Sequence, residues 1–448
     1  MKLLVYVVGY ALAALVMFRF LTTDVSASSF MDGWRAVLAA LVLPGLAKYA
    51  VQVLVAPWFG PIMSLRSRRL RGKRGGPVTP RISVIVPAWN EQVGITATVR
   101  SILRSDYPDF EVVVINDGST DGTDAAMQGL LAEHRASGHH ASVVYEAQRN
   151  GGKGSALNRG LELATGEIIF TTDADSVIAR DTLRHLARQF EDPAVMSVAG
   201  NVKIGNPAGA IGLVQQLEYL YGFYFKKADA LLGSVYIVGG AAAAYRRSVF
   251  DEVGRFDEQN ITEDIEMSTR IQDAGHRIAY APNAVVYTEA PVEWRGLARQ
   301  RLRWKFGRLM TFVQYRHLFF SLRRRHSWFL TLLVLPAALL SEFLLLLQPL
   351  ALAMLWGYTL LTSDFLPVLV YMGIVALLVT WQVFTDSRRR ESLGLLLVAP
   401  IASLVFHLAD AVEFQAAVRS GWRLLTGQGV RWQRWQRRGV FAVPAEQT

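Results

Sequence analysis

Five long apolar runs lie at the two ends of this 448-residue chain, and they restrict its fold more than any other feature. Two precede a long region of mixed polarity and three follow it: residues 3–21, 36–57, 328–357, 365–384 and 394–412. An α-helix needs about 20 apolar residues to cross a bilayer, and the first four runs approach or exceed that length. The chain is therefore expected to combine membrane helices at both ends with one water-facing region between them.

The third C-terminal run, 394–412, is ambiguous because it contains Pro400, His407 and Asp410. A spanning helix would place the basic tail that follows it outside the cell, against the tendency of Lys and Arg to remain on the cytoplasmic side. A re-entrant or interfacial helix would keep the tail inside. Both interpretations are compatible with the sequence.

Basic residues cluster beside the apolar runs and predict the orientation of the chain, whose formal net charge is +10. The loop 22–33 has no Lys or Arg, whereas residues 66–74 contain six of them. By the positive-inside rule, we expect the N-terminus and the region from residue 66 onward in the cytoplasm. The clusters at 323–325 and 388–390 and the basic tail are interpreted in the same way, as anchors at the cytoplasmic surface.

Two classes of function are excluded or disfavoured by composition. The chain has no cysteine, which excludes disulfides, thiolate zinc sites and a cysteine nucleophile. The basic clusters are not accompanied by any nucleic-acid recognition motif, so we expect no nucleic-acid partner.

Residues 80–290 alternate short β-branched runs with stretches of helical pattern. The expected strands are residues 82–87, 110–116, 142–146 and 167–172. Such alternation is typical of a mostly parallel sheet whose strands are joined by right-handed helical crossovers. Ligands bind such sheets at the carboxyl ends of the strands. Residues that directly follow a strand are therefore the first candidates for a functional site.

An acidic motif, Asp-Ala-Asp at 173–175, directly follows the strand 167–172. Two carboxylates one residue apart at a strand end suit a hard cation with oxygen ligands, such as Mg²⁺ or Mn²⁺. Alone, the motif could equally cap the start of a helix. The glycine-rich segment 150–158 lacks the spacing of a Walker loop, but its Lys153 suits either a diphosphate contact or a solvated loop.

Three residues of Gln-Arg-Leu-Arg-Trp (300–304) are predicted to share one face of a helix. Gln300, Arg303 and Trp304 are spaced three and four residues apart, which brings them to the same side. A guanidinium at such a place can neutralise a diphosphate, and an indole ring can stack on the apolar face of a pyranose. The alternative is an amphipathic helix at the membrane surface, anchored by the tryptophan.

Five motifs occur in a fixed order, and together they resemble those of processive family 2 glycosyltransferases. They are Val-Pro-Ala-Trp-Asn-Glu (86–91), Asn-Asp-Gly-Ser-Thr-Asp (116–121), Asp-Ala-Asp (173–175), Thr-Glu-Asp (262–264) and Gln-Arg-Leu-Arg-Trp (300–304). This class contains cellulose, hyaluronan and poly-N-acetylglucosamine synthases. In size and layout the chain is most similar to bacterial poly-β-1,6-N-acetylglucosamine synthases. The resemblance implies a GT-A-like α/β cytoplasmic domain with a mostly parallel sheet, fused to an α-helical transmembrane region.

This resemblance and the apolar runs together predict four segments. They are two N-terminal transmembrane helices (1–65), a cytoplasmic glycosyltransferase domain with interfacial helices (66–326), two or three C-terminal transmembrane helices (327–425) and a basic tail (426–448). The expected location is the cell membrane, inner or plasma, which the chain crosses several times with its catalytic domain in the cytoplasm.

A donor site at the ends of the first, second and fourth strands is implied by the resemblance. The residues expected to bind the UDP-sugar are Pro87, Trp89, Glu91, Asp117, Lys153, Asp173, Asp175 and Arg303. Among them, Asp175 is expected to bind the metal, with Asp173 binding the nucleotide or the metal, and Asp117 to contact uracil and ribose. Trp89 could equally be a packing residue, and Asp117 could belong to an ordinary Asp-Gly turn.

The resemblance also assigns a catalytic site and an acceptor site. Asp264 is expected to be the catalytic base, with Glu263 beside it, although a helix start capped by Thr262 would explain the same motif without catalysis. The residues expected to bind the acceptor are Gly239, Gly240, Gln300 and Trp304. The glycines would let a sugar approach the backbone closely, but tight packing would explain them equally well.

The implied function is inverting transfer from a UDP-sugar, with UDP-GlcNAc the expected donor, to build and translocate a β-linked polysaccharide. A single base fits an inverting displacement. The expected partners are the UDP-sugar, a growing glycan or lipid acceptor, the bilayer and an accessory membrane subunit. One alternative is a non-processive enzyme that glycosylates a membrane lipid. Another is a non-catalytic scaffold for polysaccharide export, which would not need Asp175, Asp264 and Arg303.

Overall fold

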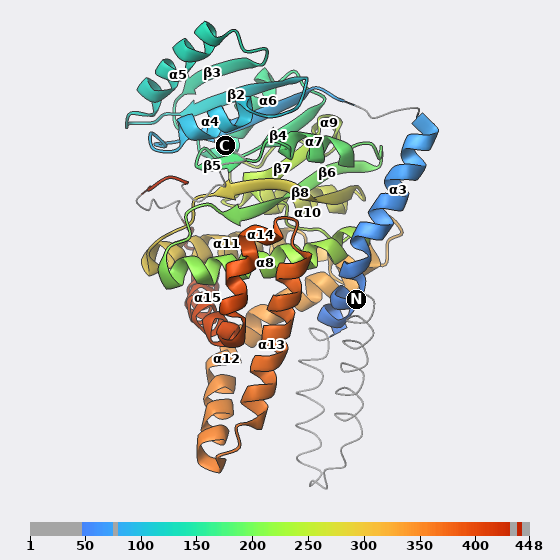
Figure 1. Ribbon diagram of the computed structural model, residues 1–448, viewed down its shortest axis with the longest axis vertical. Helices are drawn as coiled ribbons and strands as arrows, with labels where there is room; N and C mark the ends of the chain where they lie inside the picture. Colours follow the sequence, from blue (N-terminus) through green and yellow to red (C-terminus); the bar gives the residue numbers. More distant parts are fainter. Residues whose placement is uncertain (1–46, 75–78, 431–436, 441–448) are drawn as a thin grey trace. The chain divides into compact units, whose positions relative to one another are not determined.

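The computed structural model describes residues 47–74, 79–430 and 437–440 (Figure 1). Of the two predicted N-terminal runs, 3–21 and the first half of 36–57 lie outside the described residues. Within the described part, helix α3 (Phe59–Arg74) precedes the first strand.

Among the described residues, one eight-stranded sheet forms the centre of the region 80–290 (Figure 1). In sheet order its strands are β3 (Ser142–Gln148), β2 (Phe110–Asp117), β1 (Ile82–Ala88), β4 (Ile168–Thr171), β7 (Ala243–Arg246), β6 (Val195–Ile204), β8 (Arg277–Thr288) and β5 (Ser176–Ile178). The pairs β1–β2, β2–β3, β1–β4 and β6–β8 are parallel, whereas β7 is antiparallel to both neighbours and β5 to β8. The predicted mostly parallel sheet is confirmed, and so are its four predicted strands.

Helices cover both faces of this sheet. One face carries α4 (Ile95–Leu103), α5 (Thr123–Ser137) and α7 (Thr182–Gln189), and the other carries α6 (Lys153–Leu163), α9 (Ser248–Val253) and α10 (Glu263–Asp273). In β1, Val84 and Val86 pack on the first face and Ile85 on the second. Burial on both faces explains why the strands are continuous apolar runs. Each such side chain contributes about 1.5–3 kcal/mol to folding.

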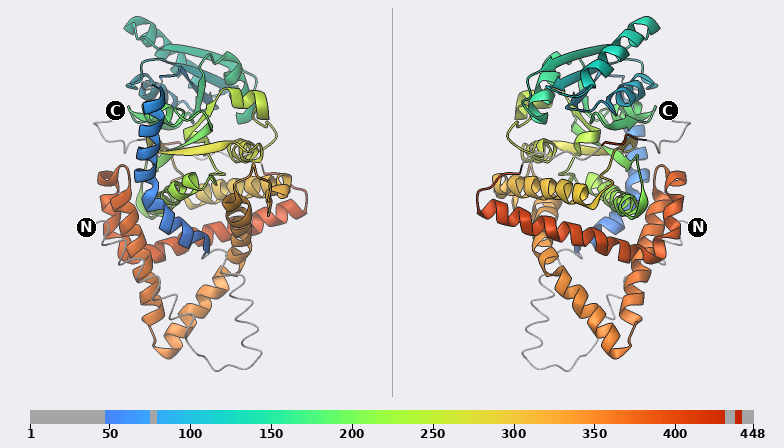
Figure 2. Two further views of the ribbon diagram at one scale, coloured as in Figure 1. Left: turned by 90° about the vertical axis from the view of Figure 1, so that its right-hand side faces the viewer. Right: turned by 90° about the vertical axis from the view of Figure 1, so that its left-hand side faces the viewer.

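Long helices lie between the sheet and the C-terminal apolar helices. They are α8 (Gly209–Leu231), α11 (Trp294–Gln314) and α15 (Ala402–Leu425), with the apolar helices α12 (Leu335–Thr362) and α13 (Leu366–Thr385) beyond them. Helix α15 packs against α11 and α8. Figure 2 shows α15 running beside α11 and across the direction of α12 and α13.

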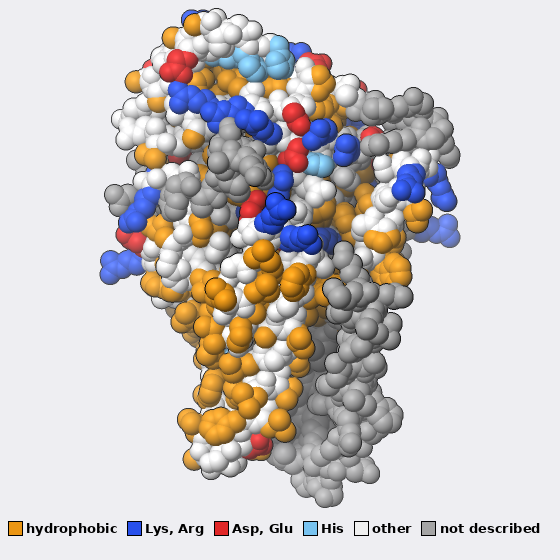
Figure 3. All heavy atoms as spheres, in the orientation of Figure 1, with side chains coloured by type: hydrophobic (Ala, Val, Ile, Leu, Met, Phe, Trp, Pro, Cys, Tyr) orange, Lys and Arg blue, Asp and Glu red, His pale blue; other side chains and the backbone are white. Residues whose placement is uncertain are grey.

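By length and composition, three stretches of the described residues could cross a membrane: Leu330–Thr362, Leu366–Thr385 and Ala399–Leu425. Hydrophobic side chains cover the visible face of α12 and α13, and Lys and Arg side chains gather above them (Figure 3). The first two stretches agree with the predicted runs. The ambiguous third run is divided, because residues 393–401 form 3-10 turns and α15 begins only at Ala402. Helix α15 packs along α11 and is also long and apolar enough to cross a membrane, so both interpretations of this run stay predictions.

Candidate active site

The predicted donor residues gather at the carboxyl ends of β1, β2 and β4, which are neighbours in the sheet. Glu91 follows β1, Asp117 ends β2, and the motif with Asp173 and Asp175 follows β4. Glu91, Asp117 and Asp175 are buried, while Pro87 and Trp89 are partly exposed beside them. Three separate sequence motifs therefore meet at one edge of the sheet.

Asn90, whose backbone has a left-handed conformation, links the turn after β1 to the turn after β2. Its φ angle is 58°, and its side-chain oxygen accepts hydrogen bonds from the N–H groups of Thr120 (2.6 Å) and Asp121 (3.1 Å). Asn tolerates this conformation better than most residues with a Cβ atom. The geometry of the first motif thus depends on the second.

Asp117 holds the glycine-rich loop that precedes α6. Its Oδ1 accepts hydrogen bonds from Gly151 N (2.9 Å) and Gln148 Nε2 (2.8 Å), and its Oδ2 accepts one from Gly152 N (2.9 Å). Gly118 has φ 69°, and an added Cβ there would lie 2.7 Å from Asn150 N. The structure therefore gives Asp117 a loop-anchoring contact that the sequence analysis did not anticipate. Its predicted contact with uracil stays a prediction.

Lys153, the first residue of α6, lies between carboxylates from two distant motifs. Its Nζ is 2.7 Å from Asp173 Oδ1 and 3.1 Å from Glu263 Oε1. Burial lowers the pKa of Lys153, but the nearby carboxylates outweigh this effect and hold the pKa well above its usual value. Burial alone would raise the pKa of Asp173, but Lys153 outweighs this effect and holds the pKa below its usual value.

The predicted base, Asp264, lies in the first turn of α10. Its Oδ2 accepts a 2.8 Å hydrogen bond from Gly240 N. An added Cβ at Gly240 would come within 2.8 Å of Lys153 Nζ and 3.5 Å of Asp264 Oδ2, so a larger residue there would displace the Lys153 ammonium group. An added Cβ at Gly239, the residue before Gly240, would meet no described atom within 4 Å, so there is open space at this position.

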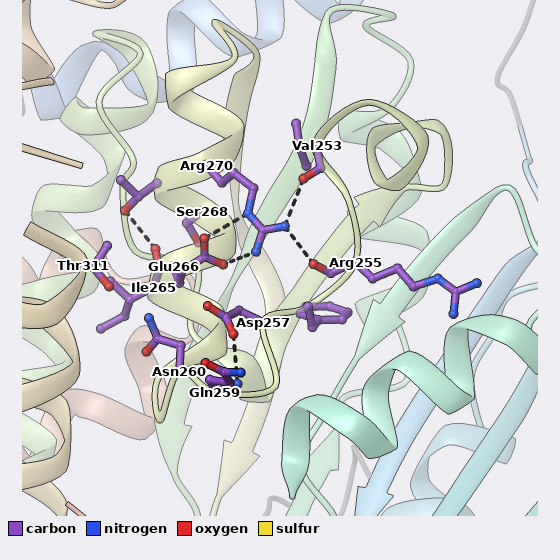
Figure 4. A network of polar contacts seen from close by, with 12 residues as sticks. Val253, Arg255, Asp257, Gln259, Asn260, Ile265, Glu266, Ser268, Arg270 and Thr311 are labelled. Atoms are coloured by element: carbon purple, nitrogen blue, oxygen red, sulfur yellow. Dashed lines mark hydrogen bonds and ion pairs between the residues drawn. The ribbon is translucent and has the colours of Figure 1, made fainter. Parts of the chain in front are cut away.

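Helix α10 is held in place by an arginine on its outer side (Figure 4). Arg270 donates hydrogen bonds to both carboxylate oxygens of Glu266 and to the carbonyl oxygens of Val253 (2.9 Å) and Arg255 (2.8 Å). Tyr315, directly after α11, donates a 2.6 Å hydrogen bond to the same Glu266. These contacts fix the helix whose N-terminus carries Glu263 and Asp264.

Helix α11 brings the last predicted motif to this cluster. Burial lowers the pKa of Arg303, while the negative charges of Glu263, Asp173 and Asp264 act in the opposite direction, so the guanidinium lies within electrostatic range of these carboxylates. Gln300 is 8% exposed, and its Oε1 has no hydrogen-bond partner among the described residues. The guanidinium of Arg301 lies 4.4 Å from the ring centroid of Trp304, in a cation–π contact.

Contacts on other sides of α11 set its position. An added Cβ at Gly307 would lie 2.8 Å from the Cβ of Thr262, so α11 touches the start of α10 directly. Lys305 pairs with Glu342 of α12 (3.0 Å) and with Glu413 of α15 (2.8 Å). The helix that carries Arg303 and Trp304 is therefore tied to the catalytic domain and to the apolar helices at once.

Asp175, the predicted metal ligand, is paired with an arginine from the C-terminal tail. Asp175 Oδ2 is 2.5 Å from Arg437 Nη1, and the other nitrogen of that guanidinium binds Glu91. The main-chain N–H of Arg438 donates a 2.6 Å hydrogen bond to Glu289. Burial and Asp175 raise the pKa of Glu91 to about 8, although Arg437 opposes this, and burial also raises the pKa of Glu289.

These acidic residues suit a divalent cation by their chemistry. In the described part of the chain, no three His, Asp or Glu side chains form a ready metal cage. Glu91 Oε2 and Glu289 Oε2 are nevertheless buried without a hydrogen-bond partner among the described residues. Carboxylate oxygens are the ligands that Mg²⁺ and Mn²⁺ prefer. Glu91, Asp175 and Glu289 therefore offer the type of ligand that the predicted cofactor uses, without forming a ready cage in the described part of the chain.

Sequence reasoning missed three participants in this cluster. Arg437 was assigned to a membrane-anchoring tail, Glu289 was not singled out, and Gly307 lies outside the predicted motif. The position of Glu289 directly after strand β8 was a usable signal, by the same rule that identified Asp173. Arg437 and Glu91 are 346 residues apart, so no local pattern could have linked them.

A separate cavity of about 390 Å³ lies between α8, the β6–β8 pair and the end of α13. Lys203, Tyr224 and Gln382 are among its lining residues, and none of the predicted site residues lines it. It is therefore distinct from the cluster around Asp264.

The GT-A-like sheet and the family comparison identify the protein as a glycosyltransferase. The model of the glycosyltransferase like family 2 matches residues 80–307, just over half of the chain. The chain therefore belongs to glycosyltransferase family 2, as the order of the five motifs predicted.

Named relatives agree with the predicted resemblance. The chain is 32% identical over 229 residues to the poly-beta-1,6-N-acetyl-D-glucosamine synthase of Staphylococcus aureus (strain COL), and 31% identical over the same length to that of Staphylococcus epidermidis. Each match covers 50% of this chain and 54% of the relative, so the chain spans about half the length of the curated relatives it matches.

The fold extends beyond the matched region. A solved structure of a mannosyltransferase from Pyrobaculum calidifontis, in complex with GDP-Man and Mn²⁺, aligns with 86% of this chain and 98% of its own, with a TM-score of 0.53 and 24% identity. This likeness supports the GT-A-like architecture of the chain.

Proposed function

We propose that the protein is a membrane-embedded inverting glycosyltransferase that polymerises a β-linked polysaccharide from a UDP-sugar, with UDP-GlcNAc as the donor. The observation that carries the proposal is the position of Asp264. Its carboxylate is held 2.8 Å from Gly240 N, beside open space at Gly239 and next to the cations Lys153 and Arg303. A carboxylate fixed beside cations can take a proton from an acceptor hydroxyl while a diphosphate leaves.

Each charged group has a proposed role in the transfer. Asp264 accepts the proton of the acceptor hydroxyl, and Glu263 holds Lys153 in place through their ion pair. Lys153 and Arg303 neutralise charge on the leaving diphosphate. A divalent ion, Mg²⁺ or Mn²⁺, would be held by Asp175 with Glu91 and Glu289 beside it, and would supply positive charge to the diphosphate. The mannosyltransferase of similar fold was solved with Mn²⁺, which is consistent with this assignment.

The acceptor side is proposed from the position of α11 beneath the cluster. Trp304 would stack on the terminal sugar of the acceptor, while Gln300 offers an unpaired buried oxygen for a sugar hydroxyl. The ion pairs of Lys305 connect this helix to α12 and α15, toward the apolar helices. We propose that the glycan passes through this helical region, with residues 66–326 in the cytoplasm and 327–425 at the membrane.

The test is to incubate the purified full chain, in lipid, with a panel of UDP-sugars and GDP-mannose in the presence of Mn²⁺ or Mg²⁺. Nucleotide release and product length are measured together, and the Asp264→Asn variant serves as the inactive control. Long polymer from one UDP-sugar supports the proposal. If the product is a single sugar on an extractable lipid, with no longer species at any donor concentration, polymerisation is rejected. The result would then favour the alternative, a non-processive enzyme that glycosylates a membrane lipid. No release with any donor would contradict both.

A further inference from the structure

The tail segment 437–440 is docked on the catalytic domain at the proposed metal position. Arg437 binds Glu91 and Asp175 through its side chain, and Arg438 binds Glu289 through its main chain. Val440 packs with Ala179, Val285 and Tyr287, and an added Cβ at Gly205 would collide with it. The docking therefore combines buried ion pairs, a main-chain hydrogen bond and apolar packing.

The charge of Arg437 is placed where a cation is required. Its side chain is 13% exposed, and its two ion-pair partners are each 8% exposed. Carboxylates buried together without a cation repel one another and lose their hydration, at a large cost. Glu289 also acts on Arg437 electrostatically. A guanidinium from the tail thus stabilises an acidic cluster that otherwise needs another positive charge.

The guanidinium of Arg437 and a divalent metal ion cannot easily bind this acidic cluster at the same time. Arg437 contacts one oxygen of Glu91 and one of Asp175, while Glu91 Oε2 and Glu289 Oε2 lack partners among the described residues. A hard divalent ion binds carboxylate oxygens directly, so an ion at Asp175 would use the oxygen that the guanidinium contacts. The two cations therefore compete for the same carboxylates.

We propose that the guanidinium of Arg437 occupies the position of the divalent metal. The tail must therefore leave Glu91 and Asp175 before the metal and the nucleoside diphosphate of the donor can bind. The proposal rests on the proposed function, because it assumes a metal-dependent nucleotide donor. If the tail is docked in about nine molecules of ten, the apparent affinity for the metal complex is about 10-fold weaker than that of the free site.

The chain offers a matched pair of variants for the test. Arg437→Ala removes the guanidinium that enters the cluster, whereas Arg438→Ala removes the same charge from an exposed side chain and retains the main-chain hydrogen bond to Glu289. Unbound Mn²⁺ is measured by its electron paramagnetic resonance signal during titration of the full chain, with and without UDP. We expect Arg437→Ala to bind Mn²⁺–UDP about 10-fold more tightly and Arg438→Ala to stay within about 2-fold of the wild type.

A second measurement uses the unmodified chain, in case Arg437→Ala does not fold. Trypsin cleavage after Arg437 is followed by mass spectrometry, and we expect Mn²⁺–UDP to accelerate it, because the displaced tail becomes accessible. Cleavage that is unchanged or slowed by Mn²⁺–UDP would overturn the proposal.

The titration separates this inference from the proposed function. Normal Mn²⁺–UDP binding by the wild type, with equal or weaker binding by Arg437→Ala, rejects competition and leaves the proposed function standing. Absence of Mn²⁺–UDP binding by every variant rejects both.

Discussion

The main-chain N–H of Gly240 donates a 2.8 Å hydrogen bond to Oδ2 of Asp264, although the two residues belong to different motifs. This bond orients the carboxylate at the start of α10 and leaves its surroundings open on the side of Gly239. The proposed catalytic base is thus oriented by the main chain of a glycine, where an added Cβ would displace the ammonium group of Lys153.

Replacing Asp264 by Asn is expected to reduce sugar transfer by about two to four orders of magnitude, the usual contribution of a positioned base. The amide keeps the shape of the side chain but cannot accept the proton. Donor binding, measured by UDP titration, should change little. The matched control is Asp251→Asn on the exposed side of α9, which should retain activity. Near-normal synthesis by Asp264→Asn would remove this residue from the mechanism.

Removal of divalent cations is expected to abolish turnover, because the acidic set around Asp175 would lose the ion that binds the diphosphate. The measurement is UDP release after chelation and dialysis, followed by addition of Mg²⁺, Mn²⁺ or Ca²⁺. Recovery with Mg²⁺ or Mn²⁺, and no recovery in Asp175→Asn, is the expected pattern. Full activity in a chelator would show that the metal assignment is wrong.

Trp304→Ala is expected to shorten the product far more than it weakens UDP binding. Loss of an aromatic platform costs about 0.5–1.5 kcal/mol beyond the area that it buries, which corresponds to about 2- to 12-fold weaker acceptor retention. Product length is measured by gel or mass spectrometry at a fixed donor concentration. The control is Trp294→Ala, at the exposed start of the same helix. Equal shortening by both variants would argue against a specific role for Trp304.

Gly307→Ala is expected to lower the free energy of unfolding by about 1–3 kcal/mol, because the new methyl group would collide with Thr262. Gly222→Ala on α8 is the control, since an added Cβ there meets no described atom within 4 Å. Higher helix propensity should make that control neutral or more stable. Thermal unfolding in detergent provides the comparison. Identical behaviour of the two variants would contradict the close contact between α10 and α11.

The parts of this fold that are local in sequence could be predicted, and those that depend on distant segments could not. The β-branched strands β1 and β2 are buried on both faces, so their composition reveals them directly. Asp173 and Asp117 follow strands, which places them at the functional edge of a parallel sheet. Strand β7 lies antiparallel between β4 and β6, and its own sequence does not indicate this. The direction of pairing depends on the path of the chain between these strands.

The same distinction applies to the candidate site. Gln300, Arg303 and Trp304 could be grouped by helical spacing alone. Arg437 looked like one more residue in a basic tail, and its contact with Glu91 depends on tertiary structure. The role of Asp117 in holding the loop at Gly151 and Gly152 was hidden for the same reason.

Lys305 of α11 pairs with Glu342 of α12 and with Glu413 of α15. A movement of these apolar helices would therefore be transmitted to α11, which also contacts the catalytic domain. In the proposed arrangement, where α12 crosses the membrane, a bilayer thinner or thicker than its apolar length would change the tilt of that helix. Through Lys305, such a tilt would shift the ring of Trp304 relative to Asp264. The thickness of the surrounding lipid would thereby become a variable in the rate of sugar transfer.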